Sequence, residues 1–197
     1  MKIIKWILIS IAGLLALIAI VGLIAKKEYT VVREVTINKP KHEIYEYIKY
    51  LKNQKNYSKW EQMDPNVTMN YTGTDAEIGF VSAWDSKLDS VGAGEQEIKK
   101  MTPDARIDYE IRFKRPFENT SGGYLELAEL APNQTKVTWG FNGKMPFPFN
   151  VMLLTMDMDK MLGRDLTVGL NNLRVLMEAM PTPVAEPQDS VVTAKTK

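Results

Sequence analysis

The chain has 197 residues, with 25 basic and 24 acidic side chains, one histidine and no cysteine. That length gives room for one domain with a sizeable core plus appendages. The net charge of +1, with no basic block outside the N-terminal flank, argues against nucleic acid as a partner. Without cysteine there is no disulfide scaffold and no thiolate site, and a single histidine, His42, disfavours serine-histidine triads and multi-histidine metal centres. We therefore expect no metal and no cofactor.

The first segment is apolar from Trp6 to Ala25 except for Ser10, with lysines on both sides. A run of this length can cross a hydrocarbon core of about 30 Å at about 1.5 Å per residue. A cleaved signal peptide is the alternative, but its apolar region is usually roughly 7 to 15 residues, and Leu23 stands where a small residue would precede a cut after Ala25. We predict a single-pass membrane anchor with basic flanks over residues 1–27. Because lysines flank both ends, the side of the soluble domain stays open, with an extracytoplasmic position favoured.

Segments that alternate apolar and polar residues follow the anchor, as half-buried strands do. The clearest runs from Ile107 to Phe113, and others lie at 29–37, 67–71, 80–84, 95–100, 125–127 and 137–141. Turns of a few residues separate them, which indicates an antiparallel meander. A short helix is expected after Pro40.

The C-terminal part has the spacing of a helix with one apolar face. The residues that carry this pattern are Met158, Leu162, Leu166, Leu170, Leu173 and Met177. We predict that the helix begins at Val151 with Asn150 as its cap, ends at Met180 and bends near Gly163, since a straight helix of that length would span about 46 Å at 1.5 Å per residue. Residues 181–197 lack periodicity and are predicted to form a disordered tail.

Several positions together resemble a known family. They are Val31, Arg33, Val35, Ile37 and Pro40 near the start; Trp60, Trp84, Gly92, Gly94, Gln96, Ile98, Pro103, Ile107, Phe113 and Pro116 in the middle; and Thr135, Val137, Trp139, Gly143, Gly169, Leu170, Leu173 and Glu178 toward the end. This arrangement resembles the polyketide cyclase/dehydrase-like branch of the SRPBCC (START/Bet v 1-like) superfamily, over about three quarters of the chain. One departure is Tyr57, near a place where members often have a second tryptophan.

The resemblance implies an α+β helix-grip fold, in which a curved antiparallel sheet wraps around a long C-terminal helix. Together with the transmembrane helix, it divides the chain into an anchor (1–27), an SRPBCC domain (28–180) and a tail (181–197). It also implies a hydrophobic cavity between the sheet and the last helix, used by different members for lipids, sterols, quinones or polyketides. It implies no common catalytic set, so no catalytic residue is assigned.

We expect the cavity to be lined by inward side chains of the strands and of the last helix, with Arg33, Ser82 and Tyr109 as the polar contacts. The candidate residues are Arg33, Phe80, Ser82, Trp84, Tyr109, Ile111, Phe113, Trp139, Phe141, Met161, Leu166, Gly169 and Leu170. The same aromatic residues could instead fill a packed core. Arg33 could equally pair with a carboxylate at the sheet margin, and Gly169 could serve close packing rather than open space.

Three functions remain open at this stage. The first is a membrane-anchored binding or carrier domain for a hydrophobic small molecule such as a lipid, isoprenoid or polyketide-like compound. The second is a cyclase, dehydratase or hydrolase that uses Tyr109, Arg33 and a carboxylate such as Glu95. The third is a protein-interaction module with a filled core, whose exposed apolar segment 147–154 would meet a protein partner that is unknown. The same segment could instead be a lid over the cavity mouth, a patch that dips into the bilayer, or a segment packed under the helix bend.

Overall fold

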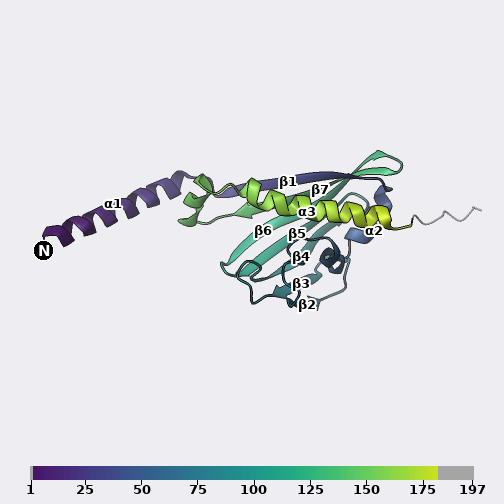
Figure 1. Ribbon diagram of the computed structural model, residues 1–197, viewed down its shortest axis with the longest axis horizontal. Coiled ribbons are helices and arrows are strands. Elements are labelled where there is room, and N and C mark those ends of the chain that lie inside the picture. Colours follow the sequence, from purple (N-terminus) through teal and green to yellow (C-terminus); the bar gives the residue numbers. More distant parts are fainter. Residues whose placement is uncertain (1, 182–197) are drawn as a thin grey trace, which may run out of the picture.

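The computed structural model describes residues 2–181 (Figure 1). The helical elements are α1 (Lys2–Ile24), α2 (Lys41–Ile48), the 3-10 helices η1 (Leu51–Asn56) and η2 (Phe149–Leu154), and α3 (Met158–Ala179). The strands are β1 (Glu28–Ile37), β2 (Thr68–Thr72), β3 (Val81–Asp85), β4 (Ala93–Thr102), β5 (Arg106–Arg115), β6 (Asn119–Ala131) and β7 (Gln134–Lys144). Apart from Pro181, the predicted tail lies outside the described residues.

The seven strands form one antiparallel sheet in the order β1-β7-β6-β5-β4-β3-β2. Consecutive strands from β2 to β7 are neighbours, as the short turns require. The last strand, β7, pairs with the first strand, from Glu28 opposite Lys144 to Ile37 opposite Thr135. The predicted helix-grip fold is therefore confirmed.

Helix α3 lies along the sheet beside β1 and β7 (Figure 1). Its buried face carries Leu166, Leu170, Leu173 and Met177, which recur at helical spacing as the sequence predicts. These side chains join a core that includes Ile37, Ile98 and residues of the other strands. The amphipathic pattern of the C-terminal segment thus identifies the face of α3 that packs against the sheet.

The start of the C-terminal helix differs from the prediction. The segment after Pro148 forms the separate helix η2, and α3 begins at Met158, where the Asp157 side chain accepts a hydrogen bond of 2.9 Å from the Lys160 amide. The break lies between η2 and Asp157, so the predicted bend near Gly163 is wrong, because a capping aspartate restarts the helix before that glycine. Asn150 does not cap a following helix either, since its side chain binds α1.

The glycine at position 163 is explained by packing against Arg33 rather than by a bend of the helix. The Arg33 guanidinium lies across the helix backbone there, and a Cβ at Gly163 would come within 1.9 Å of Arg33 Nη2. The guanidinium makes two bonds of 2.8 Å to the two carboxylate oxygens of Asp159. The missing side chain therefore lets β1 and α3 be joined by a bidentate ion pair.

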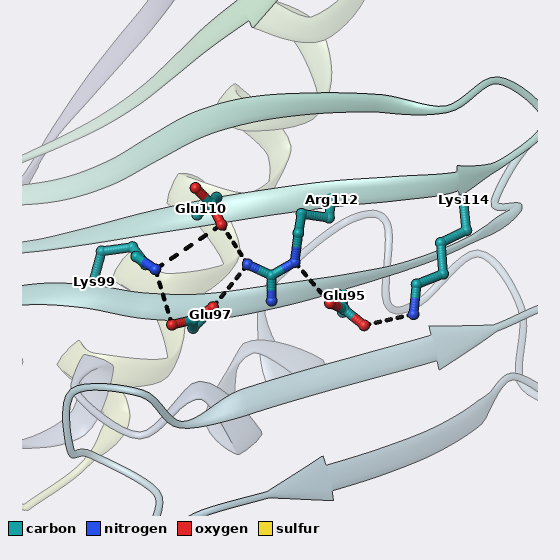
Figure 2. Close-up of polar contacts among 6 residues, drawn as sticks. All are labelled: Glu95, Glu97, Lys99, Glu110, Arg112 and Lys114. Carbon is teal, nitrogen blue, oxygen red and sulfur yellow. Dashed lines mark hydrogen bonds and ion pairs between the residues drawn. The ribbon is translucent and has the colours of Figure 1, made fainter.

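The outer face of the sheet carries a charge network centred on Arg112 (Figure 2). Arg112 bonds Glu95 and Glu97 of β4, each at 2.7 Å, and Glu110 of its own strand, while Lys114 bonds Glu95 at 2.5 Å. The cations lower the pKa of Glu95 and Glu97, with the hydrogen bonds from Lys114 and Lys99 as the largest causes. Glu95 is thus held on the face turned away from α3 (Figure 2).

Candidate ligand-binding site

Between α3 and the curved sheet lies a cavity of about 260 Å³. Its walls come from β3 to β7, from α3, and from the segment between η1 and β2. Small-molecule sites usually have volumes of roughly 300 to 1,000 Å³. The cavity is slightly smaller than that range, so its volume suits one apolar chain or a compact ring system.

Eight of the predicted site residues lie on the cavity wall. They are Ser82, Trp84, Tyr109, Ile111, Phe113, Trp139, Phe141 and Leu166. Strand alternation sends these sheet residues to the face that α3 covers. Trp139 is the centre of an aromatic group, with its ring 5.7 Å from that of Tyr57 and 6.1 Å from that of Trp60, both edge-on.

Three predicted residues are buried next to the cavity but are not part of its wall. Phe80 stacks on Tyr71 with a ring separation of 6.0 Å, and Leu170 belongs to the packed core. A Cβ at Gly169 would lie 2.8 Å from the Trp139 ring. The glycine therefore serves close packing of α3 on the sheet, which was one of its two expected roles.

The remaining two predicted residues lie elsewhere. Arg33 is committed to Asp159, as the alternative interpretation of this arginine expected, and the largest cause of its raised pKa is that hydrogen bond. Met161 is 52% exposed on the outer side of α3. Neither side chain is part of the cavity wall.

A second group of wall residues was not anticipated from the sequence. Gln54 comes from η1 and Met69 from β2, while Ser58, Glu61 and Val67 come from the segment between these two elements, which folds over one side of the cavity. This segment has no regular periodicity, so its inward residues leave no pattern in the sequence. Its only sequence signal is the presence of Tyr57 and Trp60 at a spacing of three residues.

Several polar side chains on the wall make no hydrogen bond with any residue of the described range 2–181. Besides the fully buried groups of Gln54 and Tyr109 and the exposed Asp89 and Ser90, they include four buried or half-buried side chains, Ser58, Glu61, Ser82 and Gln96. Buried polar groups are normally hydrogen-bonded, so partnerless ones on a cavity wall offer specific contacts to a bound molecule. The cavity thus combines a mostly aromatic surface with a few polar contact points.

Glu61 is the most distinctive of these four. Its carboxyl has no ion pair within the described chain, and burial raises its pKa from 4.5 to about 7, opposed only weakly by Lys55. The same carboxyl acts electrostatically on Tyr57 and Tyr71. Near neutral pH the cavity therefore contains a carboxyl that exchanges between its protonated and charged forms.

Tyr109 lines the cavity with its ring rather than with its hydroxyl. The hydroxyl oxygen is fully buried and has no hydrogen-bond partner among the described residues, and the same is true of Tyr57 Oη and Gln54 Nε2. The Gln54 amide lies close enough to the Tyr109 phenol for a hydrogen-bond interaction that lowers its pKa, but the two groups do not meet the geometry of a full hydrogen bond. Burial raises the pKa of Tyr109, so the phenol stays neutral and is not available as a base.

We expect Tyr109→Phe to stabilise the protein by about 1 kcal/mol, because it removes a buried hydroxyl that has no partner. Urea unfolding followed by tryptophan fluorescence would measure the change. Tyr45→Phe is the matched control, since the Tyr45 hydroxyl is not among the buried partnerless atoms. A loss of stability in Tyr109→Phe would show that its hydroxyl is bonded in solution.

The cavity opens at one end of the sheet. The exposed wall residues Asp89, Ser90 and Pro116 lie in the β3–β4 and β5–β6 connections. Strand pairing places the ends of β3, β5 and β7 at the same end of the sheet as the start of β1, so these connections lie at the end of the domain from which α1 departs (Figure 1). The cavity mouth and α1 are therefore on the same side of the domain.

The family model described as "Polyketide cyclase / dehydrase and lipid transport" matches residues 28–178. The chain belongs to this family. The resemblance noted from the sequence is thus confirmed over the same region. A search of curated proteins returned no match.

Solved structures similar to this polyketide cyclase/dehydrase family member share its fold at low sequence identity. The hypothetical protein jhp0584 from Helicobacter pylori is 12% identical, with 80% of this chain and 92% of that chain covered and a TM-score of 0.58. Protein MLL2253 from Mesorhizobium loti is 14% identical, with 78% and 100% covered and a TM-score of 0.56. The Aha1 dimer from Colwellia psychrerythraea is 14% identical, with 77% and 97% covered and a TM-score of 0.52. At these identities the likeness shows the fold alone.

Proposed function

We propose that this protein is a membrane-anchored domain that binds an apolar small molecule between its sheet and α3. The cavity of about 260 Å³, lined by aromatic side chains and by polar groups that have no hydrogen-bond partner among residues 2–181, is the observation that carries the proposal. The family description, which includes lipid transport, supports an apolar ligand. A lipid, isoprenoid or polyketide-like chain has the shape and polarity that this interior would take up.

The anchor part of the proposal rests on α1. This helix is 23 residues long, and its apolar side chains are exposed along most of its length. Over Ile3–Ile24 it is long and apolar enough to cross a membrane. At 1.5 Å per residue it reaches about 34 Å, enough to cross a hydrocarbon core. A signal sequence passes the same test of length and composition. We favour an anchored domain, single-pass, with an extracytoplasmic position.

Binding is a better account of the cavity than catalysis. Within the described residues, no hydrogen bond joins two titratable side chains on the cavity wall. Of the three acid-base groups considered from the sequence, Arg33 and Glu95 lie in ion pairs outside the cavity, and Tyr109 has its hydroxyl buried. General acid-base chemistry requires a proton donor or acceptor within reach of the reacting atom.

A cyclase or dehydratase is the second candidate, and Glu61 is the observation that favours it. A carboxyl with a pKa of about 7 on a cavity wall has the proton affinity of a general acid or base. In the binding function the same group would instead accept a hydrogen bond from the ligand. Recovery of an unchanged ligand would favour binding over this candidate.

Native mass spectrometry of the full chain, released from lipid nanodiscs, tests the binding function. We expect one tightly held apolar molecule per chain, retained after the loosely bound lipids of α1 have been removed by collisional activation. Extraction and fragmentation would then identify it. A chain that is always empty, even after equilibration with its native membrane lipids, would contradict the proposal.

A further inference from the structure

The segment that joins β7 to α3 presents apolar side chains to its surroundings. Phe147, Phe149, Met152 and Leu154 are 44%, 56%, 43% and 64% exposed, and we call these four residues the η2 patch. Large contiguous apolar patches on protein surfaces usually mark contacts with another phase or partner. The η2 patch is therefore expected to be covered by another phase or by a partner.

The η2 patch is fixed against the last turn of α1. The buried side chain of Asn150 donates hydrogen bonds of 2.7 Å to the Gly22 carbonyl and 3.1 Å to the Ala25 carbonyl. These carbonyls belong to the end of the helix, where no intrahelical donor remains. Asn150 therefore caps the C-terminus of α1 from a distant part of the chain.

Two further contacts hold the same junction together. A Cβ at Gly22 would lie 3.0 Å from the Phe147 ring, so the glycine lets that ring lie directly on α1. The Met145 amide also donates a hydrogen bond of 2.8 Å to the Lys27 carbonyl. The patch consequently lies at the level of the last turn of α1, where the side chains of Leu23 and Ile24 are also exposed.

The position of the η2 patch beside the last turn of α1 corresponds to a defined depth in a bilayer if α1 crosses it. The last turn of such a helix lies at the boundary between hydrocarbon and headgroups, where aromatic and flexible apolar side chains are favoured. Lys26 and Lys27 follow immediately and are exposed, as expected of residues at the headgroup level. With α1 as the anchor, an apolar patch attached at that level faces the lipid of the interface.

We propose that the η2 patch inserts into the bilayer interface beside the end of α1 and fixes the domain with its cavity mouth against the membrane. This rests on the proposed function, in which α1 is the anchor. Leu88 and Phe117, 47% and 77% exposed, lie in the two connections that border the mouth and present further apolar side chains at this end of the domain. An apolar ligand then passes between bilayer and cavity without crossing water.

The absence of cysteine allows a direct test by single-cysteine labelling of the full chain. Leu154→Cys reports on the η2 patch, Leu14→Cys reports on the middle of α1, and Val175→Cys is the control on the far part of α3. All three native side chains are exposed, so the replacements leave the core intact. Each variant is labelled with an environment-sensitive fluorophore and placed, one chain per disc, in phosphatidylcholine nanodiscs that contain a nitroxide lipid.

We expect the labels at 154 and 14 to be quenched several-fold by nitroxide lipid, with 154 most sensitive to a nitroxide near the headgroup and 14 to one deep in the chain. The label at 175 should remain unquenched and water-exposed. If 154 behaves like 175 while 14 stays in the bilayer, the patch contacts water or a protein and the inference is overturned, although the anchor stands. If 14 also lies in water, the anchor itself fails and the inference fails with it.

Discussion

Replacing Ser82 with phenylalanine is expected to abolish retention of the apolar ligand. Ser82 is buried on the cavity wall, makes no side-chain hydrogen bond with the described residues, and sits in β3 opposite Gln96. A phenyl ring there projects into a cavity of about 260 Å³ and occupies space that the ligand needs. Aromatic residues suit strand positions, so the substitution fills the cavity with little effect on β3.

The measurement is native mass spectrometry of the full chain, with the dissociation constant of the ligand expected to rise at least about tenfold, which corresponds to about 1.4 kcal/mol. The matched control is Ala83→Phe, one residue along the same strand and on the opposite face, where it pairs with Glu95. The control should keep its ligand. Equal loss in both variants would indicate damage to β3, and full retention in Ser82→Phe would place the ligand outside the cavity.

The sheet part of the candidate site was predictable because strands have a fixed periodicity. Once Ile107 to Phe113 is recognised as a strand, alternation decides that Tyr109, Ile111 and Phe113 share one face. The family resemblance then assigns that face to the side covered by the last helix. All three residues line the cavity.

The rest of the site could not be predicted for identifiable physical reasons. Glu61 and Ser58 reach the cavity from an irregular segment whose path is fixed by tertiary contacts such as that between Trp60 and Trp139. A helix pattern places Gly169 on the inner face, but only the position of the Trp139 ring shows that the glycine serves packing.

The helix start was mispredicted because Asn150 and Asp157 are both good capping residues. Propensity cannot show that Asn150 is instead used by α1, more than a hundred positions earlier in the sequence. The choice between two local caps was therefore made by a long-range contact.

Replacing Glu61 with glutamine is expected to change how stability depends on pH. In the folded protein burial raises the pKa of Glu61 from 4.5 to about 7, so the folded state keeps this proton at pH values where the unfolded state has lost it. Between these two values each rise in pH therefore lowers the free energy of unfolding, and above about pH 7 the penalty is complete. Because the side chain is partly exposed, we expect a total of roughly 1 to 3 kcal/mol.

Glutamine has no such proton, so Glu61→Gln should match the native protein near pH 4.5 and exceed its stability at pH 8 by roughly 1 to 3 kcal/mol. The depressed pKa values of Glu95, Glu97 and Asp159 act in the opposite sense, because their stabilisation is lost only as pH falls below the window used here.

Urea midpoints of the ligand-free protein at the two pH values give the difference directly. Glu77→Gln, at an exposed carboxylate away from the cavity wall, is the control for the same chemical change. If Glu61→Gln were less stable than the native protein at pH 8, the carboxylate would have to be held by a cation or a hydrogen-bond donor inside the cavity. The variant would then also lose any ligand that needs a hydrogen-bond acceptor at this position.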